Sequence, residues 1–389
     1  MLRFSLFFLT IFNITLYAQT GSLSPVNGKT TGLFPYLEYG MGADRLGGAK
    51  MTYLDTGILV QVVDSTVMNY KIRLSGQHHA YLPKIHFQRT DSIRRQPWYL
   101  TGSWKVWGDD KADFVSVTLD EKLPYRSYQL LHPSRIVVEV FGATSNTNWI
   151  TQLQSAREIK NVYHEQPEDD LFRIIIELRH NQHWGYQVAY EGKRLLIKVK
   201  RQPPVLSLSR MKIAVDAGHG GENNGARGKE TGILEKEYNL LIAKELEKTL
   251  KAEKATVFMT REKDTSLSMN ERLLALQKAE PDFLISIHLN SSSKDSIRGT
   301  STYYRYIGYR PLTEHIQKAM LKTGLKEFGN IGSFNFTLSG PTEYPNCLVE
   351  VAFLSNKEDE KLIRSSVFRK KVARAITEGI KNWLNACRN

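Results

Sequence analysis

The sequence predicts a multidomain protein, in which two small all-β domains precede an α/β domain whose mostly parallel sheet has helices on both faces. Three observations support this prediction. The first two hundred residues contain short segments rich in β-branched and aromatic residues, which is typical of strands. Pro203 and Pro204 then interrupt the chain, since paired prolines cannot continue a sheet interior. From Met211 onward, short apolar strands alternate with amphipathic helices, as in a parallel sheet packed between helices.

The composition is that of a globular protein with an excess of positive charge. The chain has 389 residues, of which 41% are hydrophobic and 24% charged, and its formal net charge is +13. This composition excludes wholesale disorder. The charge suits anionic polymers of the cell envelope or membrane surfaces as well as nucleic acid. Because no run of Lys and Arg with interleaved aromatic residues accompanies it, we expect no nucleic-acid partner.

Residues 1–18 have the layout of a secretory signal peptide. A short positive start with Arg3 precedes an apolar stretch over residues 4–17, and Ala18 offers a small residue for cleavage. The apolar stretch is short for a membrane span, although an uncleaved anchor helix remains the alternative. We therefore predict an exported protein of the periplasm or cell envelope, with no stable membrane span after signal cleavage.

Residues 33–90 are predicted to form the first β domain. Strand-like segments occur at residues 58–63, 70–74 and 80–83. Together with the Asp-Arg-Leu-Gly-Gly segment at residues 44–48, they resemble a bacterial SH3-like module. In that family the small barrel usually binds cell-wall or peptide ligands. A purely structural barrel without a ligand is the alternative, and both interpretations remain open.

Residues 110–201 are predicted to form the second β domain. The segment at residues 133–142 and the later strand at residues 173–178 look like an AMIN domain. That family is a small β-sandwich which targets envelope amidases to peptidoglycan. His180 and His183 lie three residues apart in a polar connection, where we expect an exposed turn rather than a metal site.

A linker is predicted at residues 202–209, followed by the α/β domain at residues 210–387. In open sheets of this type, ligands gather at the carboxyl ends of the strands. The predicted strands are residues 212–216, 256–260, 282–288 and 347–354, and the predicted helices are residues 238–250, 269–278 and 367–386.

Four residues of the α/β domain point to a metal site. His219 directly follows a strand in a Gly-His-Gly-Gly turn, Glu235 begins a helix, and His288 ends a strand. Two neutral imidazoles and one carboxylate leave the fourth position of a catalytic zinc ion for a reactive water. Glu350 lies within an apolar strand, where a carboxylate is costly to bury unless a cation is near. The pattern predicts a zinc hydrolase in which Glu350 is free to move protons.

These motifs resemble the zinc-dependent N-acetylmuramoyl-L-alanine amidases over residues 212–383. The resemblance implies that His219, Glu235 and His288 bind one zinc ion and that Glu350 is catalytic. The helix start offers a second acid, Glu237, but only Glu235 precedes a lysine as in the family. The implied partner is peptidoglycan, cleaved between N-acetylmuramic acid and the L-alanine of the stem peptide.

The implied chemistry follows from zinc, which makes a water molecule acidic and polarises the amide carbonyl. Glu350 would take the proton of that water and pass it to the departing amine. Cell-wall remodelling or daughter-cell separation is the expected role. Whether a protein activator of the cell-division machinery is a further partner stays open, as does the preferred stem peptide.

Other polar residues of the motifs are interpreted as structural. Arg261, Asp264 and Arg272 are expected to form ion pairs rather than to take part in catalysis. The segment between His288 and Glu350 shows no obvious long inserted helix, so we expect an accessible site. The chain departs from the commoner family pattern at positions that bear no ligand, namely Ala217, Asn223, Gln277 and Ala352.

Two rival functions remain to be weighed. A cysteine peptidase of the cell wall would use Cys347, but this residue starts a strand and lacks a context that lowers a thiol pKa. A non-catalytic wall-binding scaffold is disfavoured because all four candidate positions are retained. The sequence does not decide whether Cys347 and Cys387 form a disulfide.

Overall fold

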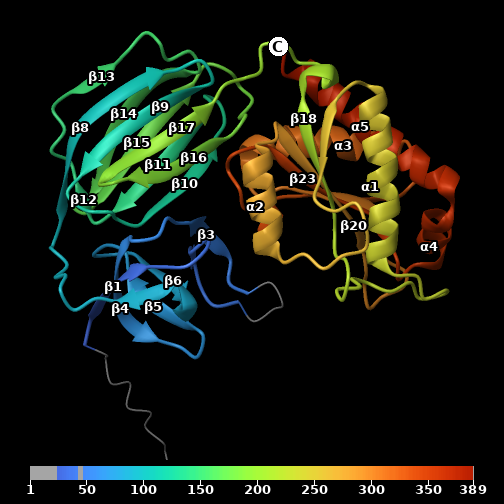
Figure 1. Cartoon of the computed structure of the whole chain (residues 1–389), viewed down its shortest axis with the longest axis horizontal. Helices are drawn as coiled ribbons and strands as arrows, with labels where there is room; N and C mark the ends of the chain where they lie inside the picture. The colour runs from blue at the N-terminus through green and yellow to red at the C-terminus, as the bar shows by residue number, and fades with distance from the viewer. Residues whose placement is uncertain (1–23, 43–46, 389) are drawn as a thin grey trace, which may run out of the picture.

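The computed structural model describes residues 24–42 and 47–388, which form three units in chain order (Figure 1). The predicted signal peptide lies outside the described residues, as do residues 44–46 of the SH3-like motif. No helix in the described part of the chain is long and apolar enough to cross a membrane.

The N-terminal unit, residues 26–89, is a seven-stranded sheet of order β3-β2-β6-β5-β4-β1-β7 in which every pairing is antiparallel. The strands predicted at residues 58–63, 70–74 and 80–83 are confirmed, whereas the SH3-like assignment stays a prediction. The elements are β1 (Val26–Thr30), β2 (Tyr36–Glu38), β3 (Lys50–Tyr53), β4 (Leu59–Ser65), β5 (Asn69–Arg73), β6 (His79–Pro83), the 3-10 turn η1 (Lys84–His86) and β7 (Phe87–Arg89).

The sandwich unit, residues 99–200, contains two sheets that share one hydrophobic core. One sheet has the order β10-β11-β15-β14, and the other has the order β12-β8-β9-β17-β16, with β13 paired to β8. Strand β8 precedes residue 110, the predicted start of this domain, yet it pairs with β9. The strands are β8 (Tyr99–Gly108), β9 (Ala112–Leu119), β10 (Tyr125–Leu130), β11 (Arg135–Phe141), β12 (Ala143–Thr144), β13 (Ile150–Gln152), β14 (Ile159–Glu168), β15 (Leu171–Leu178), β16 (Tyr186–Glu191) and β17 (Arg194–Lys200).

The α/β unit, residues 208–386, is built on a six-stranded sheet of order β19-β18-β20-β23-β21-β22. Its pairings are parallel except for that of β21 with β23, so the mostly parallel sheet is confirmed. The strands are β18 (Lys212–Ala217), β19 (Thr256–Met259), β20 (Phe283–Asn290), β21 (Thr300–Tyr303), β22 (Glu327–Ile331) and β23 (Asn346–Phe353). The helices are α1 (Glu235–Ala252), α2 (Met269–Ala279), α3 (Arg310–Leu321), α4 (Lys357–Arg364) and α5 (Ser366–Ala386), with 3-10 turns η2 (Leu208–Arg210), η3 (Ile307–Tyr309) and η4 (Thr337–Ser339).

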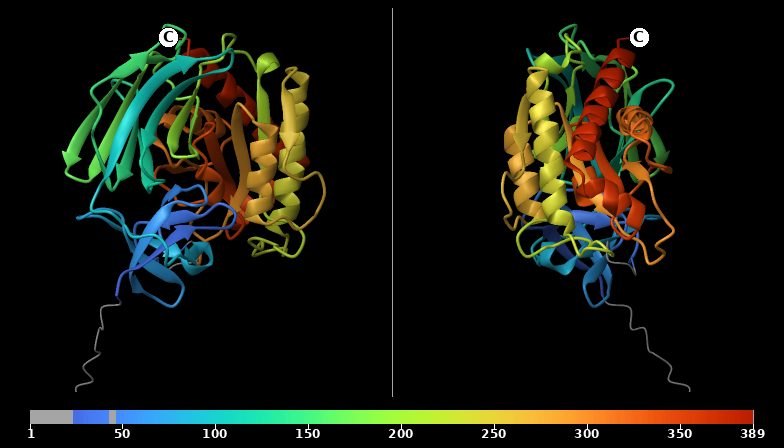
Figure 2. Two further views of the ribbon diagram at one scale, coloured as in Figure 1. Left: turned by 60° about the vertical axis from the view of Figure 1, so that its left-hand side comes forward. Right: turned by 90° about the vertical axis from the view of Figure 1, so that its right-hand side faces the viewer.

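The two faces of this sheet are covered differently. Side chains alternate along a strand, so Ile213 and Val215 of β18 join the core beneath α1, α3 and α5, whereas Ala214 faces α2. Figure 2 shows α1 and α5 side by side on the first face. On the second face, Phe34 and Tyr53 of the N-terminal unit pack against the same cluster as α2. Helices do cover both faces, but the N-terminal unit shares the second one.

The sandwich unit is fastened to the α/β unit by buried polar and aromatic contacts. The Gln182 side chain donates to the carbonyl of Gly308 (2.8 Å) and accepts from the indole of Trp383 (2.9 Å). The ring of Trp184 lies 5.0 Å from that of Trp383. The predicted linker is not free, because Leu206 is buried in the core of the α/β unit. The two units therefore meet at a packed interface.

The expectation of an exposed turn at His180 and His183 is wrong for the second residue. His183 is only 1% exposed, and its Nε2 lies 3.0 Å from the Ser134 hydroxyl and 3.2 Å from the carbonyl oxygen of Leu130. Burial lowers the pKa of His183 to about 4, so the imidazole is neutral. His180 is partly exposed and lies 2.7 Å from a carboxylate oxygen of Glu158.

Candidate metal centre

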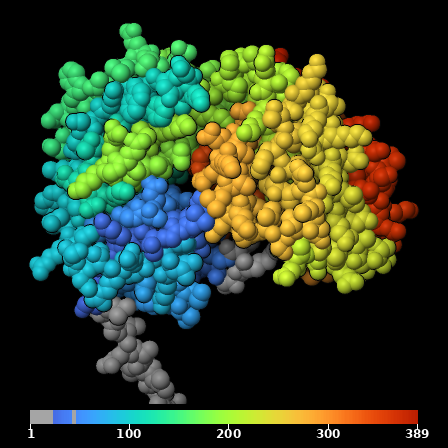
Figure 3. Space-filling view, in the orientation of Figure 1, coloured from blue at the N-terminus to red at the C-terminus, as the bar shows by residue number. Residues whose placement is uncertain are grey.

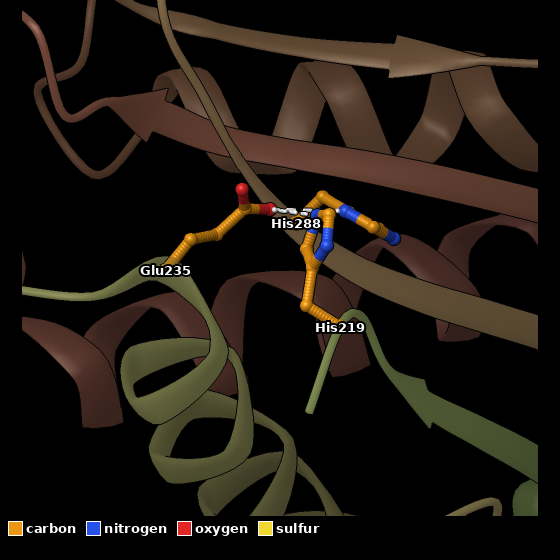
Figure 4. A group of neighbouring side chains, drawn as sticks. All are labelled: His219, Glu235 and His288. Carbon is orange, nitrogen blue, oxygen red and sulfur yellow. Dashed lines mark hydrogen bonds and ion pairs between the residues drawn. The ribbon is translucent and has the colours of Figure 1, made fainter. Parts of the chain in front are cut away.

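Three side chains converge at the carboxyl ends of β18 and β20 (Figure 4). His219 Nε2 lies 3.1 Å from Glu235 Oε1, and His288 Nδ1 lies 3.0 Å from the same oxygen. The three potential ligand atoms all lie within 4.8 Å of one another. Within the described ranges, this is the one group of three or more His, Cys, Asp or Glu side chains so placed. The structure thus brings the three predicted ligands together.

The turn after β18 brings the backbone unusually close to the ring of His288. A Cβ atom on Gly218 would lie 2.2 Å from Cε1 of His288, so only glycine fits there. His219 itself has a φ of 61°, and Gly221 follows with a φ of 58°. These left-handed conformations turn the chain sharply enough to point the imidazole of His219 back toward Glu235.

A neighbouring amide sets the tautomer of His219. The side-chain oxygen of Asn223 lies 2.9 Å from His219 Nδ1 and accepts its hydrogen. With Nδ1 protonated, Nε2 presents its lone pair toward Glu235 and His288. Asn223 stands where the amidase pattern more often has Asp, and the neutral amide supplies the acceptor that this orientation needs.

Glu235 is the first residue of α1, and several donors fix its carboxylate. Oε1 accepts from the backbone N–H of Leu289 and from the side chain of Asn239, both at 3.1 Å, while Oε2 accepts from the N–H of Ala226 at 2.7 Å. Burial acts to raise the pKa of Glu235, but its interactions with His219 and His288 outweigh that effect and hold the pKa below its usual range. The carboxylate is therefore ionised. Glu237, the alternative acid, is exposed.

Glu350 lies in the same hollow as the three converging side chains. Glu350 of β23 lies opposite His288 of β20 in the register of the sheet. It is 8% exposed and lines a cavity of about 680 Å³ together with His219, Glu235 and His288. Burial lowers the pKa of His288, but the negative charges of Glu235, Glu350 and Asp216 raise it above its ordinary value. Two imidazoles and two nearby carboxylates make a donor set that fits a divalent cation such as zinc.

Further walls of the cavity come from segments without a recognisable motif. Asn290 and Ser291 extend from the end of β20, Met269 begins α2, and residues 336–338 approach from the connection between β22 and β23. Residues 336–338 were not predictable as site residues from the sequence, since nothing in Phe-Thr-Leu indicates a role. Helix α3 lies between His288 and Glu350 in the sequence, but it packs on α5 and does not line the cavity.

Two arginines hold the turn that carries His219. Arg272 forms a buried ion pair with Asp216 and donates to the carbonyl of His219 at 2.6 Å. Arg261 donates to the carbonyls of Ala217 (2.8 Å) and Gly218 (3.0 Å). Thus Arg272 is confirmed as an ion-pair partner, whereas Arg261 binds backbone oxygens instead.

Asp264 is also structural. Its carboxylate accepts from the backbone N–H of Gly221 at 2.7 Å and lies 3.1 Å from Lys236 Nζ. The same ammonium group donates to the carbonyl oxygen of Gly221. Asp264 and Lys236 therefore fasten the glycine turn to the start of α1.

The two cysteines are free and inert. Cys347 is buried and does not line the cavity, and burial raises its thiol pKa. Burial likewise raises the pKa of Cys387 to about 12. Neither thiol forms the thiolate that a nucleophile requires, so the geometry disfavours a cysteine peptidase.

Comparison with known proteins finds family matches for two of the units. Residues 213–382 match the family described as N-acetylmuramoyl-L-alanine amidase (Amidase_3), and residues 103–199 match the AMIN domain. The N-acetylmuramoyl-L-alanine amidase LytC of Bacillus subtilis is 35% identical over 172 residues, which are 43% of this chain and 34% of that protein. The probable cell wall amidase LytH of Staphylococcus aureus is 33% identical over 175 residues, which are 45% of this chain and 58% of that protein.

The likeness to these relatives is confined to part of each chain. The match spans about a third of the length of LytC and somewhat more than half of that of LytH. Among solved structures, the catalytic domain of CwlV, an N-acetylmuramoyl-L-alanine amidase from Bacillus (Paenibacillus) polymyxa var. colistinus, is 33% identical with a TM-score of 0.43. That alignment covers 45% of this chain and 98% of the solved one.

Proposed function

We propose that this chain, which carries an Amidase_3 domain behind an AMIN domain, is a zinc-dependent N-acetylmuramoyl-L-alanine amidase that hydrolyses peptidoglycan. The bond cleaved joins the lactyl carbonyl of N-acetylmuramic acid to the nitrogen of L-alanine in the stem peptide. The observation that carries the proposal is the convergence of His219, Glu235 and His288 on one point beside Glu350.

His219 through Nε2, His288 through Nδ1 and Glu235 through Oε1 would hold the metal. Zinc bound there would supply a Lewis acid for the amide carbonyl and lower the pKa of a water molecule to about 7. The anchoring of Glu235 by Leu289, Asn239 and Ala226 keeps its carboxylate in place without help from the metal. Such supporting contacts orient ligands and tune their affinity.

Glu350 would move the protons of the reaction. As the water oxygen forms its bond to the lactyl carbonyl carbon, the Glu350 carboxylate takes a proton from that water. It then passes the proton to the amide nitrogen as the carbon–nitrogen bond breaks, because an amine cannot leave as an anion. Its place on the cavity wall beside His288 suits this role.

The other units suit an enzyme of the cell envelope. We propose that the AMIN domain, and an SH3-like module in the N-terminal unit, hold the enzyme on the wall after export to the periplasm or envelope. The net charge of +13 favours binding to an anionic polymer. Wall remodelling or daughter-cell separation is the proposed role.

Two variants of the full chain test the assignment. Glu350→Gln should keep its zinc and lose turnover by at least about 100-fold, the usual contribution of a general base, whereas His219→Ala should lose the metal. Zinc content by elemental analysis and muropeptide release by mass spectrometry measure both. Glu237→Gln, which changes an exposed acid near Glu235, is the matched control and should behave as the wild type. An active Glu350→Gln enzyme would contradict the catalytic assignment.

A further inference from the structure

The segment of residues 332–340 forms one wall of the candidate site and is anchored outside its own domain. It connects β22 to β23, and its residues Phe336, Thr337 and Leu338 line the cavity that contains the metal-binding group. Only the short turn η4 interrupts it. Because this part of the cavity wall is a connection rather than a long helix or strand, its position depends on its contacts with neighbouring segments.

Among the described residues, two hydrogen bonds join Asn335 of this segment to the N-terminal unit. Its side-chain oxygen accepts from the backbone N–H of Lys50 at 3.1 Å, and its side-chain nitrogen donates to the carbonyl of Gly48 at 2.8 Å. One amide thus satisfies a backbone donor and a backbone acceptor at the start of β3. Such paired bonds fix both the distance and the orientation of the two segments.

A second contact lies next to the first. Arg305, which follows β21, donates to the carbonyl oxygen of Lys50. Tyr53, at the end of β3, packs in one hydrophobic cluster with Leu338. A Cβ on Gly340 would lie 2.7 Å from Tyr53 Cε2, so the tyrosine ring rests directly on the backbone of the segment. In the view of Figure 3, the N-terminal unit, in blue, lies against the orange part of the α/β unit.

We infer that Asn335 is a positioning residue, through which the N-terminal unit sets the wall of the amidase site and so its fit to substrate. This inference rests on the proposed function. It gives the N-terminal unit a role beyond the proposed binding to the cell wall. Strand β3 holds a segment that lines the reaction cavity, although Lys50 and Asn335 are 285 residues apart in the sequence. Asn335 acts through the cavity wall formed by residues 332–340 and does not touch the reacting bond.

The test compares Asn335→Ala with Ser333→Ala in the full chain. Ser333 lies in the same segment, is exposed, and does not line the cavity, so it is a matched control. Hydrogen exchange of residues 332–340 measures the order of the wall without reference to activity. The KM and kcat for purified peptidoglycan, together with zinc content, measure the consequence for the site. Tyr53→Leu repeats the test from the side of the N-terminal unit.

For Asn335→Ala we expect exchange in residues 332–340 and KM each to rise by at least about fivefold, the effect of losing one ordinary hydrogen bond, because the variant loses two. The value of kcat should stay within about twofold of the wild type, with zinc content unchanged. Tyr53→Leu should act in the same direction, and Ser333→Ala should have no effect. Wild-type exchange and KM in Asn335→Ala, or equal changes in Ser333→Ala, would overturn the inference. If the wild type itself releases no muropeptides, the proposed function fails, and the exchange data alone decide whether Asn335 orders the wall.

Discussion

At the scale of single residues, Gly218 decides how closely the turn after β18 approaches the ring of His288. A methyl group in place of its hydrogen would meet that ring at 2.2 Å. We predict that Gly218→Ala displaces the imidazole and weakens zinc binding by about 10-fold or more, as expected for a disturbed ligand support. Competition titration with a zinc chelator measures the affinity.

Gly40→Ala is the control for this substitution, because a Cβ there meets no atom within 4 Å. Its zinc affinity should equal that of the wild type. Equal affinities for Gly218→Ala and Gly40→Ala would show that the turn does not need to lie so close to His288.

The grouping of His219, Glu235 and His288 was predictable from the sequence because each belongs to a local motif at a strand or helix end. His219, Glu235 and His288 are each flanked by residues that fix the backbone nearby. The burial of His183 was not predictable, because it depends on Ser134 and on Gly308 of the α/β unit, where a Cβ atom would lie 2.6 Å from the imidazole. The contacts of Asn335 were not predictable either, since its partners are backbone atoms at a distant strand.

At the scale of elements, the ion pair between Arg272 of α2 and Asp216 of β18 fastens helix to sheet. Both side chains are 1% exposed. Burial acts to raise the pKa of Asp216, but Arg272 and the hydroxyl donors Ser286 and Thr260 hold it below its usual range. We predict that Arg272→Ala destabilises the protein by about 3–5 kcal/mol, because a buried charge is left uncompensated. Urea unfolding measures the change.

Lys251→Ala is the matched control on the surface of α1. Lys251 pairs with Glu247 one turn away, and its side chain is 58% exposed. Such exposed pairs contribute about 0.5 kcal/mol or less. A loss for Arg272→Ala as small as that for Lys251→Ala would mean that the pair does not hold α2 in place.

The elements predicted from the sequence were those with strong periodicity. Strands β18, β20 and β23 and helices α1, α2 and α5 are apolar enough along one face to be recognised. Strand β21 reads Thr-Ser-Thr-Tyr and has no apolar alternation; it is buried because hydroxyls such as that of Thr302 find partners inside the domain. Tertiary hydrogen bonds of this kind leave no pattern in the sequence.

At the scale of the whole molecule, the interface between the sandwich and the α/β unit carries a pH-sensitive group. His183 has a pKa of about 4 in the folded protein, below its ordinary value of 6.5. Between these values the unfolded chain binds a proton that the folded chain does not, so stability falls as the pH decreases. We predict a loss of about 2 kcal/mol between pH 7 and pH 5 from this residue.

Urea unfolding of the wild type and of His183→Gln at both pH values isolates this contribution. Other groups titrate equally in the two proteins, so the difference between their pH dependences belongs to His183. The variant should lose less stability than the wild type on acidification. Identical pH dependences in both would show that burial of the imidazole is not linked to folding.

Contacts between units were beyond prediction from the sequence. Gln182 reaches Gly308 and Trp383 across long stretches of chain, and Lys50 reaches Asn335 across an even longer one. Each contact involves a backbone group or an ordinary side chain, so nothing in the sequence around one partner indicates the other. The order of the three units follows from the sequence, but their interlocking does not.

One zinc ion held by His219, Glu235 and His288 is the central claim, and diffraction at the zinc absorption edge tests it most directly. Crystals of the full chain grown with one equivalent of zinc should show a single anomalous peak about 2 Å from one atom of each side chain, as zinc–nitrogen and zinc–oxygen bonds require. A peak held by other residues, or none between these three, would contradict the claim.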